Sequence, residues 1–386
     1  MVIYYTAIGL IFLCIILFET ALRNVKHRRF FESLFCGIIV FLVLSLKKET
    51  VGRDGTAYKA AYEWTTTVSW GQLTSKYSSF EIVFKFLMKI ASSIKVPYFL
   101  FASFLYLILC TALFLLFYWY CDIPGMAWLF FFCFGSFTFV ASALRQGLAI
   151  SLTVFSFLIF KKDKWWTYFL SLAFIAVAYL FHNSAIVFLL AIPGLLVKLR
   201  PNDFVIFLIA GITVAIFAYP ILSFFYYDFP IAGRYTKSYN IFFAGGLGGS
   251  LVAIMAILAV YFVFQPYRKA SLILNERFPQ WALTERIPEP SDRAASKSND
   301  SFFVFTSEIT ILLLIVSCYF SMAARIADYF RIYLGLILIN TITRQSNKTF
   351  KTVALTLLPV LLCLYLYFTT FRENYLNLLP YRFFWQ

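Results

Sequence analysis

The sequence has little charge, few histidines and no cysteine pair of the kind that binds zinc. Charged residues make up only 13% of the 386 residues, and histidine occurs twice, whereas about a quarter of a soluble domain is charged. Two histidines exclude a histidine-rich metal site. The seven cysteines contain no CxxC pair, so neither a disulfide framework nor a zinc ribbon is supported.

Motifs for phosphate, metal and acyl-transfer chemistry are missing as well. The chain has no GxxxxGK[ST] loop, no HExxH and no GxSxG, and these mark the usual nucleotide-binding, zinc-protease and esterase sites. It also lacks a DxD motif, which argues against a metal-bound nucleotide sugar. Inverted repeats are common in transporters, and none is apparent here. We expect neither a metal nor another cofactor.

Apolar residues, by contrast, are abundant: 62% of the chain is hydrophobic, with 48 Phe and 25 Tyr. Apolar runs of about 17 residues or more recur, which is the length that crosses a bilayer as a helix. A closed barrel would alternate polar and apolar residues, and these runs do not. The composition predicts an all-α, polytopic membrane helix bundle that forms a single integral membrane domain over 1–386. About 12 spans are expected, at 3–21, 30–46, 97–120, 125–143, 145–160, 166–182, 184–198, 204–225, 248–264, 302–322, 331–343 and 352–370.

The distribution of lysine and arginine sets the expected orientation. Of the 33 basic residues, 18 lie in five segments that one topology places on the cytoplasmic side, with both termini outside. This topology leaves an outer loop at about 47–96, with an interfacial amphipathic helix at 80–95, and a polar cytoplasmic loop at about 265–300. The net charge of the chain is +15, and the basic residues that cause it are scattered between spans. We therefore expect membrane lipids as partners and no nucleic acid.

A small set of polar side chains on the outer face is not explained by composition. The set contains Arg53, Asp54, Glu81, Arg145, His182, Arg234, Arg325, Asp328, Tyr329 and Arg331. Structural explanations exist for several of them. Arg53 and Asp54 can form a solvated loop pair, and Glu81 can simply face the dipole at a helix start.

The other members also have structural alternatives. Arg145 can snorkel at the end of a span, His182 can belong to a capped turn, and Arg325 with Asp328 can form a local helix pair. Several arginines near carboxylates nevertheless favour an anion site. Guanidinium suits a diphosphate because its fork donates paired, charge-assisted hydrogen bonds and never deprotonates.

Four stretches carry a family resemblance through their order and spacing: "VGRDGTAY", "SSFEIVFKFL", "ASALRQGLAISL" and "KKDKWWTYFLSLAFIAVAYLFHNSAIVFLL". Together they resemble the EpsG family of bacterial exopolysaccharide proteins, which are Wzy-type polymerases. The matching positions are Gly52, Asp54, Tyr58, Glu81, Phe84, Arg145, Gln146, Ala149, His182, Ser184 and Ala185. The later stretches "RYTKSY", "ARIADYFRIY" and "LLPYRFFW" also look typical of the family. One departure is Gly55 before Thr56, where the family usually has a threonine directly after the aspartate.

The resemblance implies a membrane-embedded, GT-C-like glycosyltransferase at the outer leaflet of a bacterial plasma membrane. Its substrates would be oligosaccharide repeat units on undecaprenyl diphosphate, which it joins by inverting transfer into exopolysaccharide or capsule. A chain-length regulator and a flippase of the same pathway would be partners. The alternatives are a flippase or transporter of the same lipid-linked units, a glycan ligase, and an assembly scaffold without chemistry.

Roles for the outer polar residues follow as expectations. Diphosphate leaves readily, so the enzyme has to stabilise charge on the departing oxygen. We expect this from Arg145, Arg325 and Arg331, with Arg53 and Arg234 in support. The base that takes the acceptor proton is His182, Asp54 or Glu81, and the sequence does not choose between them. Tyr58 and Tyr329 are further candidates for binding the sugar or the diphosphate.

Overall fold

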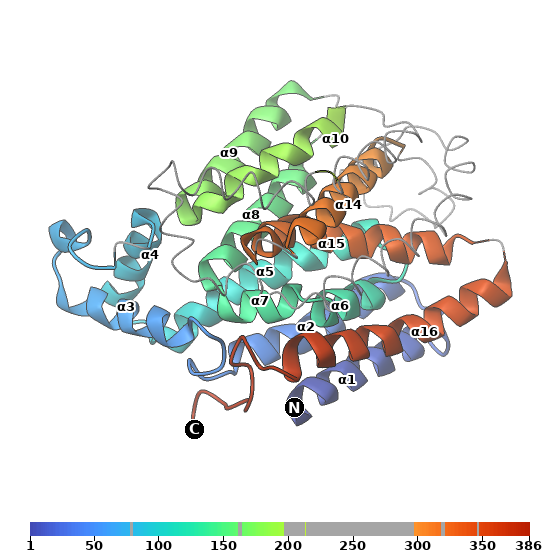
Figure 1. Ribbon diagram of the computed structural model, residues 1–386, viewed down its shortest axis with the longest axis horizontal. Coiled ribbons are helices and arrows are strands. Elements are labelled where there is room, and N and C mark those ends of the chain that lie inside the picture. Colours follow the sequence, from blue (N-terminus) through green and yellow to red (C-terminus); the bar gives the residue numbers. More distant parts are fainter. Residues whose placement is uncertain (78–79, 161–163, 197–212, 214–296, 318–320, 346) are drawn as a thin grey trace. The chain divides into compact units, whose positions relative to one another are not determined.

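The structure is a computed structural model, and its regular elements are helices (Figure 1). It describes the chain except for residues 78–79, 161–163, 197–212, 214–296, 318–320 and 346. The chain divides into two compact units, one made of Met1–Leu189 with Leu355–Gln386 and the other of Leu190–Ala354. Arg234, the predicted spans 204–225 and 248–264, and nearly all of the polar loop 265–300 lie outside the described residues.

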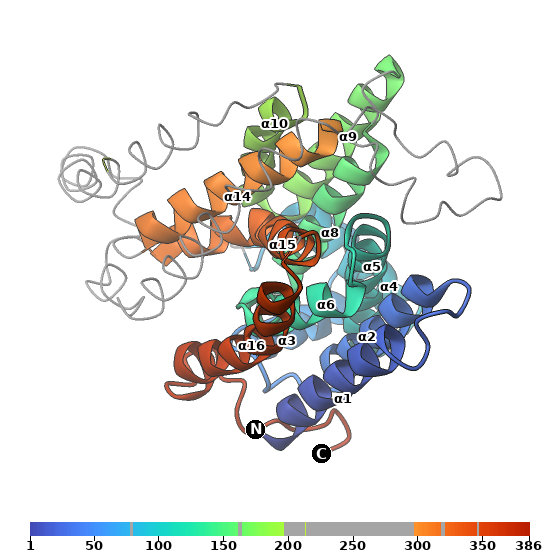
Figure 2. The ribbon, with the colours of Figure 1, turned by 90° about the vertical axis from the view of Figure 1, so that its right-hand side faces the viewer.

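The first unit holds the helices that carry most of the predicted site residues. In chain order they are α1 (Val2–Glu19), α2 (Arg28–Ser45), α3 (Gly55–Thr67), η1 (Trp70–Gln72), α4 (Ile82–Ser93), α5 (Tyr98–Tyr120), α6 (Pro124–Cys133), α7 (Ser136–Ser142), α8 (Leu144–Ile159) and α9 (Trp165–Phe181). The turn η2 (Asn183–Ala191) follows α9, and α16 (Lys348–Leu366) with the π-helix η7 (Tyr367–Phe371) returns to this unit. Helices α1 and α2 lie side by side, as Figures 1 and 2 show.

Four described helical segments are long and apolar enough to cross a membrane: Val2–Glu19, Tyr98–Tyr120, Ala323–Thr343 and Lys348–Phe371. A fifth would be α6 with α7, which pass the same test as a pair bent by 59°. The chain is therefore a helical, membrane-embedded protein. The larger count of about 12 spans stays a prediction.

The bend between α6 and α7 has a local cause. Gly135 adopts φ +100° between the two helices, a left-handed conformation that glycine tolerates far better than other residues. Every residue of α6 is buried, and α6 packs on α1, α2 and α5. The predicted span 125–143 is thus a broken segment inside the bundle, and a break of this kind is tolerated at membrane depth only when protein surrounds it.

The segment 47–96, predicted as an outer loop with one helix, contains two α-helices, α3 and α4, with the short η1 between them. Helix α3 packs on α4, and the predicted interfacial helix 80–95 is α4. The side chains of Lys85 and Lys89 are buried. Lys89 Nζ donates to the carbonyls of Thr65 and Val68 at the end of α3, at 2.9 and 2.7 Å, so it satisfies carbonyls that the helix leaves open.

With its lysines turned inward, α4 presents an apolar surface. The exposed large side chains of this segment recur at four-residue spacing, at Ile82, Phe86, Ile90 and Ile94. Phe86 also stacks on Trp70, with ring centroids 5.8 Å apart. The exposed residues of α3, by contrast, include Thr56, Glu63, Thr66 and Thr67. The α3–α4 pair therefore has one polar and one apolar side.

The second unit contains α10 (Ile192–Leu196), α14 (Lys297–Ser317) and α15 (Ser321–Thr343). Helix α14 packs along α15, with the rings of Phe302 and Tyr333 5.0 Å apart. The sequence placed the motif "ARIADYFR" in an outer loop before a span at 331–343. That boundary was wrong, because α15 begins at Ser321 and the whole motif is helical.

Candidate active site

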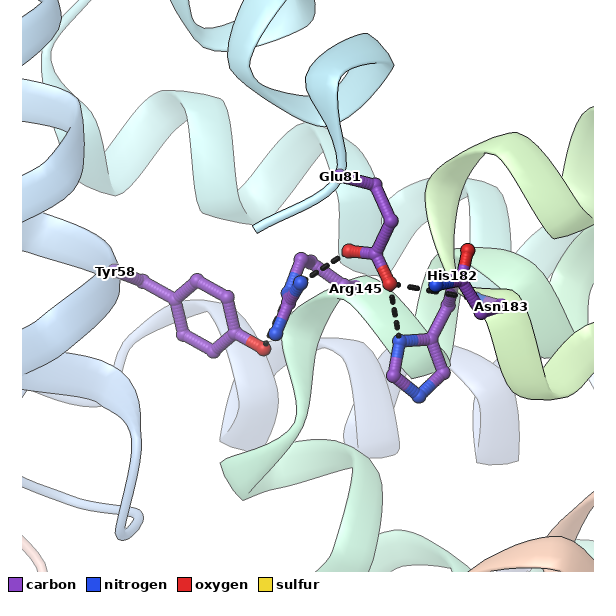
Figure 3. A network of polar contacts seen from close by, with 5 residues as sticks. All are labelled: Tyr58, Glu81, Arg145, His182 and Asn183. Carbon is purple, nitrogen blue, oxygen red and sulfur yellow. Dashed lines mark hydrogen bonds and ion pairs between the residues drawn. The ribbon is translucent and has the colours of Figure 1, made fainter. Parts of the chain in front are cut away.

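Three helix ends of the first unit bring Glu81, Arg145 and His182 together (Figure 3). Glu81 immediately precedes α4, Arg145 lies in the first turn of α8, and His182 immediately follows α9. Helix α8 packs on α9, and α9 on α4. The packing of these helices therefore joins residues that are up to 101 positions apart in the sequence.

The carboxylate of Glu81 is the centre of this cluster. One oxygen, Oε2, accepts a hydrogen bond and ion pair from Arg145 Nη1. The other, Oε1, lies 3.2 Å from Nδ1 of His182 and accepts from the backbone N–H of Asn183 at 3.3 Å. Glu81 is the N-cap residue of α4 but makes no side-chain cap there; its carboxylate is engaged by Arg145, His182 and Asn183.

Arg145 is held by aromatic rings as well as by Glu81. Its guanidinium carbon lies 4.3 Å from the centre of the Phe80 ring and 5.8 Å from that of Tyr58. Nε donates to the hydroxyl of Tyr58 at 3.4 Å. A cation in the first turn of a helix interacts unfavourably with the helix dipole, so the charge of Arg145 alone would destabilise α8. The ion pair with Glu81 offsets that penalty and holds the side chain, which is 13% exposed.

The surroundings of Glu81 fix its charge. Burial raises the pKa of its carboxyl, but the hydrogen bond with His182 and the charge of Arg145 outweigh burial, so the pKa lies below its ordinary value. An ionised carboxylate can only accept hydrogen bonds. When the ring of His182 is neutral, a hydrogen bond to this carboxylate requires its proton on Nδ1, and Nε2 is then the acceptor nitrogen. Figure 3 shows that this second nitrogen points away from Glu81.

A comparison with known protein families settles what kind of chain carries this cluster. The model of the EpsG family matches residues 31–383. The chain belongs to the EpsG family. Searches of the curated proteins and of the solved structures found no match. Family membership indicates a role like that of a polysaccharide polymerase, in a class associated with glycosyltransferase chemistry.

The loop that precedes α3 in this EpsG-family chain packs against the end of α7. The backbone N–H of Arg53 donates to the hydroxyl of Ser142 at 3.2 Å, and Gly52 adopts φ +105°. A Cβ at Gly52 would lie 2.6 Å from the carbonyl oxygen of Ala141. Only glycine fits this close approach and this backbone conformation together.

We expect Gly52→Ala to destabilise the first unit by about 1–3 kcal/mol, the usual penalty of a strained backbone. Thermal unfolding in detergent should show a lower midpoint than that of the wild type. Gly71→Ala is the matched control, because it lies in the same segment 47–96 and its Cβ would meet nothing within 4 Å. Equal midpoints for the two variants would contradict the close packing at Gly52.

The remaining predicted residues lie elsewhere. Arg53 is exposed, and its guanidinium carbon lies 4.7 Å from the ring centre of Tyr375. Asp54 is half-buried at the start of α3. The pKa of Tyr58 is raised, mainly by burial and also by the charge of Asp54, while Arg145 lowers it. Neither residue makes a hydrogen bond or ion pair with Glu81, Arg145 or His182 in the first unit.

The arginines near residue 330 belong to the second unit. Arg331 Nη1 pairs with Asp328 Oδ1 at 3.0 Å, and both side chains are buried. The sequence offered a local helix pair of Arg325 with Asp328 as a structural alternative; the structure pairs Asp328 with Arg331, three residues after it. Arg325 is exposed and Tyr329 is fully buried. The roles of these residues in substrate binding stay predictions.

Sequence reasoning missed three parts of the EpsG-family site. They are the ring of Phe80 beneath Arg145, the backbone N–H of Asn183 at Glu81, and Tyr375 beneath Arg53. Phe80 and Asn183 adjoin Glu81 and His182, so adjacency was an available signal for them. No sequence signal links Tyr375 to Arg53. Within the described ranges, no three side chains of His, Cys, Asp or Glu are placed to hold a metal ion.

Proposed function

We propose that this protein joins oligosaccharide repeat units carried on undecaprenyl diphosphate into exopolysaccharide or capsular polysaccharide. The reaction takes place at the outer leaflet of the bacterial plasma membrane, in a membrane-embedded glycosyltransferase fold of the C type. The observation that carries the proposal is the cluster of Glu81, Arg145 and His182 in a chain of the EpsG family. It offers a cation for a diphosphate and an oriented imidazole for a hydroxyl.

The transfer is a displacement at the anomeric carbon of the growing chain. The acceptor hydroxyl of a new repeat unit attacks this carbon, and its proton passes to Nε2 of His182. The bond from the anomeric carbon to the diphosphate oxygen breaks on the opposite face, and its electron pair leaves with undecaprenyl diphosphate. The configuration at the anomeric carbon inverts, and the polymer gains one repeat unit.

Each residue of the cluster has a distinct task in this proposal. Glu81 holds the Nδ1–H tautomer of His182, since its ionised carboxylate accepts that proton's hydrogen bond. Glu81 is itself a poor base because its pKa is lowered. Arg145 stabilises the charge that builds on the leaving diphosphate. Exposed Arg53 adds a second cation, and the supporting roles of Arg234, Arg325 and Arg331 belong to the same proposal.

Purified protein in lipid nanodiscs tests the activity directly. Supplied with the host's undecaprenyl-diphosphate repeat units, the wild type should produce a ladder of lengthened lipid-linked oligosaccharides. A flippase cannot lengthen them, and a ligase would use only one repeat unit per product. An assembly scaffold would tolerate alanine at Arg145. If the lipid-linked repeat units were not lengthened under these conditions, the proposal would be contradicted.

The pH dependence of the rate separates His182 from Glu81. Glu81 is already ionised near neutral pH because its pKa lies below its usual value, so its titration contributes no change there. The rate should fall in acid, because an imidazolium cannot accept a proton. His182→Gln should be slow and should lack this dependence. The measurement is the initial rate of ladder formation as a function of pH. If the rate of His182→Gln still fell in acid as that of the wild type does, His182 would not be the base.

A further inference from the structure

Residues 374–386 fold back along the outer end of the first unit. The backbone N–H of Lys48 donates to the carbonyl of Arg382 at 2.8 Å, and that of Phe384 donates to the carbonyl of Leu46 at 2.9 Å. The Phe384 ring stacks on that of Phe99, with centroids 4.3 Å apart. This segment is therefore attached to the end of α2 by backbone pairing and to the start of α5 by ring packing.

The same segment also holds the loop that carries Arg53. The backbone N–H of Gly52 donates to the carbonyl of Asn377 at 2.9 Å. The hydroxyl of Ser142 accepts from the N–H of Arg53 at 3.2 Å and donates to the carbonyl of Leu376 at 3.4 Å. One hydroxyl at the end of α7 thus joins the loop to the segment, three residues before Arg145.

Tyr375 completes this arrangement at the side chain of Arg53. Its ring lies beneath the guanidinium at 4.7 Å, within the range of a cation–π contact. In the described parts of the chain, Arg53 makes no ion pair with a carboxylate. Its charge is therefore oriented by an aromatic face and is not neutralised. Such a cation can bind an anion from outside the protein, since the ring leaves the N–H groups of the fork available at its edge.

We propose that Tyr375 is a positioning residue for Arg53, and that residues 374–386 act as a clamp that presents this arginine to the diphosphate of the lipid-linked substrate. The inference rests on the proposed function for the identity of the anion. The N-terminal helix α1 supports the clamp, since the Tyr4 hydroxyl donates to the carbonyl of Leu378 at 3.0 Å. The two ends of the chain also lie near each other in Figure 2.

Chemical labelling tests the contact without any assay of activity. Phenylglyoxal modifies exposed arginines, and its rate at Arg53 can be followed by peptide mass spectrometry on the full-length protein in nanodiscs. Tyr375→Ala should speed the modification of Arg53, and Tyr375→Phe should retain the wild-type rate because the ring is kept. Tyr375 is 56% exposed, so both variants should fold. Equal rates in the two variants would overturn the stacking role.

Kinetics test whether the contact serves the substrate. For the lipid-linked donor, Tyr375→Ala should raise KM about two- to fivefold, the equivalent of an exposed cation–π contact, and leave kcat unchanged. Tyr375→Phe should restore KM. The double variant Arg53→Ala with Tyr375→Ala should be no worse than Arg53→Ala alone, because both changes remove one interaction. Additive effects, or a fall in kcat alone, would overturn the proposal.

A control and a binding measurement separate this inference from the proposed function. Trp165→Ala removes an exposed aromatic ring of α9, outside the clamp, so KM should not change. A wild type that makes no polymer would count against the proposed function alone. Binding of undecaprenyl diphosphate would then decide the inference: weaker binding by Tyr375→Ala supports it, and unchanged binding overturns it.

Discussion

Replacing Glu81 by glutamine should lower kcat by a factor on the order of 10³ to 10⁴ while the protein still inserts and folds. The carboxylate now accepts from Nδ1 of His182, from the N–H of Asn183 and from Arg145. An amide at this position can donate to Nδ1, which stabilises the opposite tautomer and places the proton on Nε2. The wrong tautomer strongly lowers kcat wherever a neutral imidazole acts as the base.

The measurement for Glu81→Gln is single-turnover polymerisation, which isolates the chemical step from binding. The KM for the lipid-linked donor should change much less than kcat. Glu63→Gln is the matched control, since Glu63 is a carboxylate of the neighbouring helix α3 but its side chain is 64% exposed and makes one ion pair, to Lys59 at 4.0 Å. A near-normal kcat in Glu81→Gln would show that His182 works without an oriented tautomer.

Replacing Arg145 by alanine should lower kcat/KM about 10²- to 10³-fold, as expected when one donor to a developing oxyanion is removed. Single repeat units should then accumulate on the lipid carrier. Arg145→Lys should recover only a small part of this activity. An ammonium keeps the charge but cannot lie flat on the Phe80 ring and donate to Glu81 and Tyr58 at once, as the guanidinium does.

A second arginine controls for the loss of charge alone. Arg372 is exposed in the first unit, so Arg372→Ala removes the same charge from the surface without touching the cluster. It should give full-length polymer. Glycan gel electrophoresis of the host's product reports both variants together with immunoblots for their membrane levels. Full-length polymer from Arg145→Ala at a normal protein level would exclude Arg145 from the reaction.

The helices could be predicted from the sequence far better than the connections between them. Apolar runs fix the existence of a helix in lipid, since every backbone group there must be bonded internally, and α1, α2 and α5 begin and end within two residues of their expected bounds. The start of α15 was missed because three charged residues within seven positions resemble a loop. The ion pair of Asp328 with Arg331, three residues apart on α15, is compatible with a helix at these positions.

The site shows the same division. Glu81, Arg145 and His182 could each be selected because an ionisable residue in an apolar chain needs a reason. Their contacts could not be derived, since Glu81 and Arg145 are 64 positions apart and only helix packing makes them neighbours. In the proposed mechanism His182 is the base and Glu81 is not, an assignment that depends on the pKa shift of a carboxylate whose partners the sequence does not reveal.

The inward-turned lysines of α4 have a consequence for handling the protein. The stripe of Ile82, Phe86, Ile90 and Ile94 is exposed apart from the stacking of Phe86 on Trp70, and contact of this apolar surface with water raises the free energy of the protein. An excised fragment containing only α3 and α4 should aggregate in plain buffer, however polar its sequence looks on average. Detergents with short tails, which cover such a narrow ridge poorly, should release Lys89 from its carbonyls first and so melt the hairpin before the bundle.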